Sequence, residues 1–460
     1  MGVALTKKAK YKIILQVIAV LIIIVCWWFL PYKCLNETSI DEILYIEIAY
    51  GANGSVKRIE NREQINYIVE PIKASRLQKE KLSLGYAGID IWIAFYNKEK
   101  EKMLTFNVDG AAMRIEVCAA DIIRVQFFPG GKITQPGINT FTVDYNKDFN
   151  DYEVTESDGS LNITTSKIRM EVNTATGKIK YYDALNGELI LAEKDRSYND
   201  ITLDNNEKSY EVSQEFISDE NEALYGFGNV NGVMGIKGQS INIAQLNTEK
   251  RTPMFYSNMG YGIFFDITSN GRLDWLDENA AYRYTGFASD RMDYFFFYGP
   301  DADEVISGYR TVTGQATMLP KRAFGYIQSR NRYTSQAELE GILDTFRKKQ
   351  IPIDGLVIDY FWWNGSFNDI TNWGGSWTDP EEMMRYLHDN HVGCSISVWP
   401  SFDKDTEAYS EMDSAGGIIH SDTPFFGYVY DASSPEGRDK YWQLINDNVF
   451  SKGLDSIWLD

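Results

Sequence analysis

The sequence is poor in the residues that build metal centres and disulfide frameworks. Its 460 residues include four cysteines and three histidines, and no two cysteines form a CxxC pair. Without such spacing, neither a zinc site nor a disulfide framework is predicted. His388 and His391 stand three positions apart at the end of an expected helix, but no acidic or thiol partner accompanies them at a metal-like spacing. We therefore expect no metal site.

Positive charge is also scarce. Lysine and arginine number 45 against 65 aspartates and glutamates, which gives a net charge of −20. Phosphate binding needs a basic face, so this balance argues against nucleic acid or an anionic membrane surface as the main partner. Aromatic residues, in contrast, make up 14% of the chain. They serve core packing in the simplest interpretation, and they also suit a carbohydrate binder because the C–H faces of sugars stack on aromatic rings.

One long apolar run lies near the N-terminus. It extends from Ile13 to Leu30 with a single break at Gln16, which is about the minimum length of a membrane-spanning helix. Four lysines precede it and Trp27 and Trp28 lie at its far end, so we expect the N-terminus in the cytoplasm. A cleaved signal peptide is the alternative, but no small-residue cleavage pattern follows. We predict a cytoplasmic tail and membrane anchor in residues 1–33, with the remainder extracytoplasmic at the cell surface.

Residues 34–110 read as a small α+β module without visible chemistry. Alternating apolar residues predict strands at Leu44–Tyr50, Ile89–Phe95 and Met103–Asn107. The spacing of isoleucine and valine in Asn61–Val69 predicts a helix between them.

Residues 111–318 carry short apolar runs separated by Gly, Asn and Asp turns, which predicts a mostly antiparallel β-sandwich. Asn186-Gly187 is the strongest turn signal, because a two-residue hairpin needs positive φ at both positions. Tyr225–Gly232 is rich in glycine, but its spacing is not that of a dinucleotide loop and no helix follows. It is either a plain β connection or a loop over a neighbouring site. The expected strands include Ile122–Phe128, Ile168–Val172, Ile179–Tyr182 and Glu188–Leu191.

Residues 319–460 change to strand–helix alternation. Helix starts are predicted at Ser335, which opens a capping box, at Asp379-Pro380 and at Ser434-Pro435. The expected strands are Phe324–Arg330, Gly355–Asp359, Gly393–Trp399 and Gly453–Asp460. This is a (βα)₃β pattern with parallel strands, and four such strands form an open half of a larger domain.

Two carboxylates close strands of this second region. Asp359 and Asp460 each follow an apolar strand, so both are expected at the same mouth of the sheet. One such aspartate would ordinarily cap a helix or a turn. Two of them, with the aromatic residues Phe361, Trp362, Trp363, Trp399 and Trp458 nearby in sequence, favour a site for glycoside hydrolysis.

From about Ala111 to Asp460 the chain resembles glycoside hydrolase family 31, the α-glucosidase and α-xylosidase family. The segments that carry the resemblance are Asp121–Phe127, Tyr225–Gly228, Asn247–Glu249, Pro253–Ser257, Gly260–Gly262, Gln328–Arg330, Ile353–Asp359, Pro380, Trp399-Pro400, Tyr430-Asp431, Pro435 and Gly453–Asp460. The resemblance implies a β-sandwich followed by the first half of a (β/α)₈ TIM barrel. The N-terminal transmembrane helix expected from the apolar run lies outside the resemblance, and with it the predicted fold has several domains.

The resemblance also implies roles for particular residues. Asp460 corresponds to the catalytic nucleophile of a retaining mechanism, and Asp359 to the aspartate that binds sugar hydroxyls. That aspartate binds in the −1 subsite of the family. Trp399 and Trp458 fall where the family lines this subsite, and Phe361 is a further candidate for substrate binding. The family places its general acid/base on another aspartate later in the barrel, so we expect this chain to be truncated at the nucleophile. The chemistry needs no metal and no organic cofactor.

The resemblance implies hydrolysis of α-glucosides or α-xylosides of oligo- or polysaccharides, without separating the two. The alternative function is a non-catalytic, membrane-anchored protein that binds or senses carbohydrate.

Overall fold

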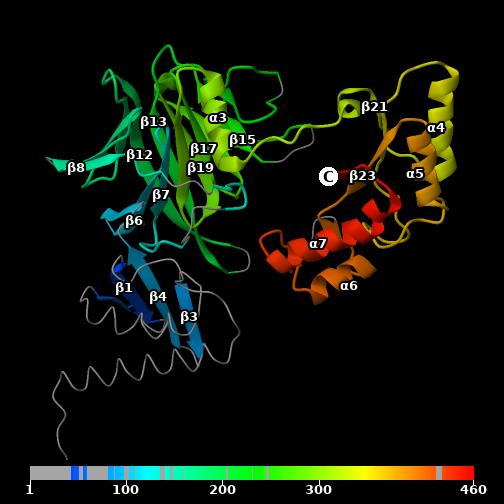
Figure 1. Ribbon diagram of the computed structural model, residues 1–460, viewed down its shortest axis with the longest axis horizontal. Helices are drawn as coiled ribbons and strands as arrows, with labels where there is room; N and C mark the ends of the chain where they lie inside the picture. Colours follow the sequence, from blue (N-terminus) through cyan, green and yellow to red (C-terminus); the bar gives the residue numbers. More distant parts are fainter. Residues whose placement is uncertain are drawn as a thin grey trace, which may run out of the picture. The chain divides into compact units, whose positions relative to one another are not determined.

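The structure, a computed structural model, describes residues 43–50, 55–59, 81–86, 89–97, 103–108, 110–134, 140–145, 149–157, 159–203, 206–230, 232–244, 248–420 and 427–460. The chain divides into two compact units, Met1–Gln315 and Ala316–Asp460 (Figure 1). The predicted membrane anchor and the predicted helix at Asn61–Val69 lie outside the described residues. Within the described ranges, no helix has the length and apolar character that crossing a bilayer requires.

A four-stranded antiparallel sheet comes first in the chain. Its order is β2-β1-β4-β3, with β1 (Ile43–Tyr50), β2 (Ser55–Ile59), β3 (Lys81–Tyr86) and β4 (Ile89–Asn97). The strands predicted at Leu44–Tyr50 and Ile89–Phe95 are therefore confirmed. The third predicted strand is β5 (Met103–Val108), and it pairs with β6 (Ala111–Ala119) in a different sheet.

Two larger antiparallel sheets form the predicted sandwich. The nine-stranded sheet has the order β15-β18-β19-β13-β12-β11-β10-β9-β8. Its strands are β8 (Glu153–Ser157), β9 (Ser160–Thr164), β10 (Ile168–Asn173), β11 (Ile179–Asp183), β12 (Leu189–Thr202), β13 (Lys208–Ile217), β15 (Ile241–Ile243), β18 (Gly271–Leu276) and β19 (Ala281–Ser289). The seven-stranded sheet has the order β14-β16-β17-β20-β7-β6-β5. It adds β7 (Ile122–Phe128), β14 (Leu224–Gly226), β16 (Met254–Ser257), β17 (Tyr261–Phe265) and β20 (Met292–Tyr298).

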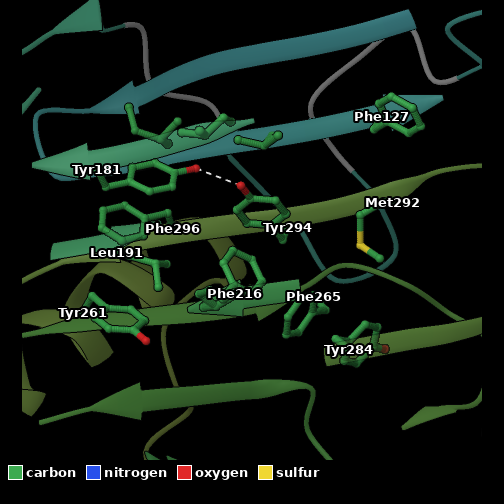
Figure 2. Packing of buried hydrophobic residues seen from close by; sticks show 14 of the residues in the cluster. Phe127, Tyr181, Leu191, Phe216, Tyr261, Phe265, Tyr284, Met292, Tyr294 and Phe296 are labelled. Carbon is green, nitrogen blue, oxygen red and sulfur yellow. Dashed lines mark hydrogen bonds between the residues drawn. The ribbon is translucent and has the colours of Figure 1, made fainter. Parts of the chain in front are cut away.

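Aromatic side chains from the two sheets meet in the sandwich core (Figure 2). Tyr181 of β11 stacks on Phe296 of β20 with 4.0 Å between ring centroids, and its hydroxyl lies 2.9 Å from that of Tyr294. Phe265 of β17 stacks on Tyr284 of β19 at 3.9 Å. Core packing thus accounts for many of the aromatic residues in this half of the chain, as the simplest interpretation of the composition predicts.

The outer face of the seven-stranded sheet is covered by a helix that the sequence analysis did not predict. Helix α3 (Ala302–Thr313) is capped by Asp301, whose side chain accepts a hydrogen bond from the backbone amide of Glu304. The helix buries Val305 and Val312 against Phe295 and Phe297. Its two buried valines stand seven residues apart, which is a helical spacing. The expectation of β structure throughout residues 111–318 is corrected there.

The hairpin at Asn186-Gly187 is present, but its turn differs from the expected one. Strand β11 ends at Asp183 and β12 begins at Leu189, and of the two turn residues Gly187 alone has a positive φ, of 77°. The Asp183 carboxylate accepts the Leu185 amide and Asn186 accepts the Glu188 amide. Side-chain acceptors therefore build a longer loop in place of the two-residue turn.

The second unit contains the predicted parallel sheet. Its order is β21-β22-β23-β26, with β21 (Ile327–Gln328), β22 (Gly355–Ile358), β23 (Gly393–Val398) and β26 (Ser456–Leu459). The connecting helices are α4 (Gln336–Lys348), α5 (Pro380–Asp389) and α7 (Pro435–Asn448), and they start at Ser335, Asp379 and Ser434 as predicted. This is the βα alternation of a partial (β/α)₈ barrel.

One excursion interrupts that alternation and was not predicted. Between β23 and α7 the chain forms β24 (Ser401–Phe402), α6 (Glu407–Ser414) and β25 (Tyr428–Val429). Three short single-turn helices complete the described elements: η2 (Asp277–Asn279), η3 (Lys321–Phe324) and η4 (Phe450–Lys452).

Candidate active site

The parallel sheet has one apolar face and one mixed face. On β22 and β23, Leu356, Ile358, Ile396 and Val398 are buried in the cluster that contains the apolar residues of α4, α5 and α7. Side chains alternate along a strand, so the positions between them face the opposite side. Asp359, Ser397, Trp458 and Asp460 occupy that opposite face. The two predicted carboxylates therefore share one side of the sheet and its C-terminal edge.

Asp359 begins the segment that follows β22. Its carboxylate is half-buried and accepts the Tyr360 amide at 2.8 Å. Phe361, two residues later, has a φ of 60° and is 43% exposed. A left-handed backbone at a bulky residue costs free energy and is a feature of functional sites. The guanidinium of Arg332 lies over the Phe361 ring at 4.8 Å, so the ring is held at the edge of the sheet.

Trp399 follows β23 directly and is half-buried. Its carbonyl oxygen accepts hydrogen bonds from the side-chain amide of Asn368 and from the Tyr441 hydroxyl, each at 2.8 Å. Its ring meets that of Phe367 edge to face, with 5.0 Å between centroids. The backbone and ring of Trp399 are thus fixed from both α7 and the segment that follows β22.

Trp458 and Asp460 come from β26. Trp458 pairs with Ser397 across the sheet and is 39% exposed, which suits a ring that contacts a ligand. Asp460 is exposed, its amide donates to the Val398 carbonyl at 3.0 Å, and its carboxylate Oδ2 accepts from the Ser397 hydroxyl at 3.1 Å. The backbone of Asp460 therefore continues the strand pairing, and its side chain is held from the neighbouring strand.

Asp359 and Asp460 are separated by the whole width of β23. Asp359 continues past the Ile358–Ile396 pair to the level of Ser397, whereas Asp460 lies two residues beyond Trp458, the partner of Ser397. Two strand spacings and two residue rises place the two Cα atoms on the order of 12 Å apart. Such a spacing suits two carboxylates that contact different atoms of one sugar ring.

Ser397 and Asn368 are candidate site residues that the sequence reasoning missed, whereas Trp362 was among the aromatic residues noted beside the carboxylates. Ser397 lies on the mixed face of β23, the Asn368 side chain donates to the Trp399 carbonyl directly after that strand, and the Trp362 indole donates to the Ser397 carbonyl at 2.8 Å. The alternation Cys394-Ser-Ile-Ser-Val398 carries a signal for Ser397, because it places two small polar residues on the face shared with the carboxylates. Nothing local in the sequence marks Asn368.

A second polar cluster lies at the opposite end of these strands. The Asp455 carboxylate accepts from Arg322 at 2.6 Å, lies 2.9 Å from His388 Nε2 and accepts the Cys394 amide at 2.8 Å. Burial raises the pKa of the Cys394 thiol well above its usual range. His388 thus belongs to a polar cluster at the N-terminal edge, where barrel residues contribute to stability. In the part of the chain that the structure describes, no group of three or more potential ligands could hold a metal ion.

Two family models match this chain. Residues 112–274 match the glycosyl hydrolase 31 N-terminal galactose mutarotase-like domain, and residues 316–460 match the glycosyl hydrolases family 31 TIM-barrel domain. The chain belongs to glycoside hydrolase family 31. Both matched regions carry the segments on which the resemblance rests, including the end of β26 with Asp460.

Curated relatives of this family 31 chain include α-glycosidases. It is 30% identical over 372 residues to an α-xylosidase of Saccharolobus solfataricus, with 76% of this chain and 47% of the relative covered. It is 25% identical to α-glucosidase 2 of Bacillus thermoamyloliquefaciens, with 86% and 52% covered. The chain therefore spans about half the length of these relatives.

Solved structures share the fold of this family 31 chain. The α-xylosidase of Xanthomonas citri superposes with a TM-score of 0.70 at 22% identity, covering 78% of this chain and 57% of the other. A dextranase of Flavobacterium johnsoniae gives 0.64 at 22% identity, with 80% and 46% covered. At these identities the likeness supports the architecture of a β-sandwich followed by part of a TIM barrel.

Proposed function

We propose that this family 31 chain provides the nucleophile and the sugar-binding groups of a retaining α-glycoside hydrolase acting on α-glucosides or α-xylosides. The observation that carries the proposal is the position of Asp460. Its carboxylate lies at the C-terminal end of a parallel strand, exposed on one side and bound to Ser397 on the other. The C-terminal edge of barrel strands is where such folds place their chemistry.

In the proposed first step, the Asp460 carboxylate attacks the anomeric carbon. Its electron pair forms the new carbon–oxygen bond while the glycosidic bond breaks, and the leaving oxygen takes the electron pair of that bond. A carboxylic acid on the far side of the sugar supplies the proton that the leaving oxygen needs. Water then hydrolyses the glycosyl–enzyme, and two inversions at one carbon retain its configuration.

The other candidate residues bind the sugar in this proposal. Asp359, about two strands away from Asp460, accepts hydrogen bonds from ring hydroxyls, which donate well to a carboxylate. Phe361, Trp399 and Trp458 supply aromatic surface for the C–H faces of the sugar. Phe361 and Trp458 suit this role because 43% and 39% of their surfaces remain exposed.

The nucleophile assignment is tested by covalent trapping. A 5-fluoro-α-glycosyl fluoride slows an oxocarbenium-like reaction through its ring fluorine, and its fluoride leaves as an anion without a proton. We expect the xylosyl or the glucosyl reagent to attach to Asp460, as found by mass spectrometry of the C-terminal peptide. Asp460→Asn is the matched control and should take no label. Sugar binding by calorimetry without labelling would instead favour the non-catalytic carbohydrate-binding function.

We also propose an extracytoplasmic, membrane-anchored location for the protein. It is supported by the sequence of Ile13–Leu30, with lysines before it and two tryptophans at its far end. The acidic bulk of the chain would then act on carbohydrate outside the cytoplasm.

A further inference from the structure

The end of β23 is held by hydrogen bonds at three successive carbonyl oxygens. The donors are Trp362 Nε1 to Ser397, the Asp460 amide to Val398, and both Asn368 Nδ2 and the Tyr441 hydroxyl to Trp399. These donors come from the segment after β22, from the neighbouring strand and from α7. Three parts of the unit therefore fix the backbone from which the Ser397 side chain projects.

The Ser397 side chain joins this fixed backbone to Asp460. Ser397 is fully buried, with no exposed surface, and its Oγ lies 3.1 Å from Oδ2 of Asp460. An ionised carboxylate only accepts hydrogen bonds, so the serine hydroxyl is the donor. Hydrogen bonds to an ionised group are stronger than those between neutral groups. The side chain of Asp460 is exposed, and this bond restrains its rotation.

We propose that Ser397 is a positioning residue for the nucleophilic attack by Asp460. The proposal rests on the function proposed above. The hydroxyl holds the carboxylate in the orientation from which it reaches the anomeric carbon, and it does so from a backbone that the sugar does not need to rearrange. Preorganisation of this kind matters because reacting groups must be placed within about 0.5 Å of the productive geometry.

The expected decrease in the rate of attack follows from the kind of hydrogen bond that Ser397 makes to Asp460. Loss of a hydrogen bond to a charged group, or a misplacement of about 1 Å, lowers the rate of the bond-forming step by roughly 10- to 100-fold. Sugar binding through Asp359 and the aromatic rings does not involve Ser397. The variant Ser397→Ala should therefore lower the rate constant of attack while leaving the affinity for the sugar nearly unchanged.

The experiment measures labelling of the full chain by the 5-fluoro-α-glycosyl fluoride at increasing reagent concentrations. In this step the Asp460 carboxylate supplies the electron pair for the new bond and fluoride leaves with the pair of the broken one, so no proton is transferred. Ser397→Ala is compared with Ser397→Thr, which keeps a hydroxyl at the same carbon. Ser395→Ala is the matched control, because Ser395 lies on the same face of β23 but pairs with Ser456.

We expect Ser397→Ala to reduce the maximal labelling rate about 10- to 100-fold with a half-saturating concentration close to that of the parent. Ser397→Thr should recover most of the rate, and Ser395→Ala should label normally. Equal labelling rates in the parent and Ser397→Ala would overturn this inference alone. Failure of Ser397→Thr to exceed Ser397→Ala, with both melting like the parent, would also overturn it. A parent that takes no label would overturn the proposed function and this inference together.

Discussion

The indole nitrogen of Trp362 donates a hydrogen bond to the backbone carbonyl of Ser397, with 2.8 Å between the two atoms. Both residues are fully buried. The bond ties the segment that carries Asp359 and Phe361 to the strand beside Asp460. The two halves of the proposed sugar site are thus joined through the interior of one unit.

The variant Trp362→Phe should destabilise the second unit by about 1–3 kcal/mol, because it leaves a buried carbonyl oxygen without its donor. Denaturant unfolding followed by tryptophan fluorescence measures the change. Trp442→Phe is the matched control, since Trp442 lies on α7 with 55% of its surface exposed. Unfolding of Trp362→Phe at the denaturant concentration of the parent would show that this bond contributes nothing to stability.

Asp460 and Asp359 should be separable by chemical rescue in a catalytically active protein that contains this chain. Asp460→Ala removes the bond-forming atom, so turnover should be lost while the fold persists, because the side chain lies at the exposed end of a strand. Azide can enter the vacated space and restore cleavage of an activated substrate with inverted configuration. Asp359→Ala should lower kcat/KM through lost hydrogen bonds to the substrate and gain nothing from azide. Rescue confined to Asp359→Ala would mean that the two roles are reversed.

The hairpin between β11 and β12 should make a pH-dependent contribution to stability. A hydrogen bond from Tyr298, together with the amides of Leu185 and Asn186, lowers the pKa of Asp183. A carboxyl whose folded pKa is depressed contributes stability above its unfolded pKa of about 3.9, and this is lost as the pH falls through the folded value. Asp183→Asn should therefore lower the melting temperature at pH 7, and by a smaller amount at about pH 3, which lies below the unfolded pKa.

Calorimetry of parent and Asp183→Asn at the two pH values measures this difference. Asp200→Asn, at an exposed position of β12, is the control and should melt like the parent at both. A decrease of equal size at pH 7 and pH 3 would mean that the effect arises from packing and not from the charge of Asp183.

The proposed anchor predicts how the unmodified chain fractionates. It should sediment with membranes and require detergent for release, because Ile13–Leu30 has about the minimum apolar length that crosses a bilayer. A variant that lacks residues 1–33 should appear in the supernatant. Recovery of the complete chain in the supernatant after lysis without detergent would exclude the anchor.

Local signals in the sequence were enough to predict helices α4, α5 and α7 and the four parallel strands of the second unit. Ser335, Asp379 and Ser434 each cap a helix through a side-chain oxygen, which is a property of a few consecutive residues. Even so, Glu338 binds the Thr334 amide in place of the Ser335 amide that a capping box would use.

The site itself was predicted only in part, because half of it depends on contacts distant in sequence. The local pattern of an apolar strand followed by an aspartate is enough to predict that Asp359 and Asp460 end parallel strands. That Ser397 meets Asp460 depends on the register of β23 against β26, which are joined through residues 399–455. The excursion with α6 was missed for a similar reason, since β24 and β25 are two residues long and pair across that helix.

At Phe361 the backbone conformation favours glycine, whereas the proposed sugar site needs the aromatic ring. A left-handed φ costs a residue with a side chain about 1–2 kcal/mol, and glycine avoids that cost. Phe361→Gly should therefore melt at a higher temperature than Phe361→Ala, because both lose the ring that packs against Arg332, Trp363 and Phe367 and only glycine relieves the backbone. The same change removes aromatic surface from the sugar site and should raise KM. Among variants without the ring, selection for thermal stability would thus favour glycine at this position, whereas selection for activity would keep the phenylalanine.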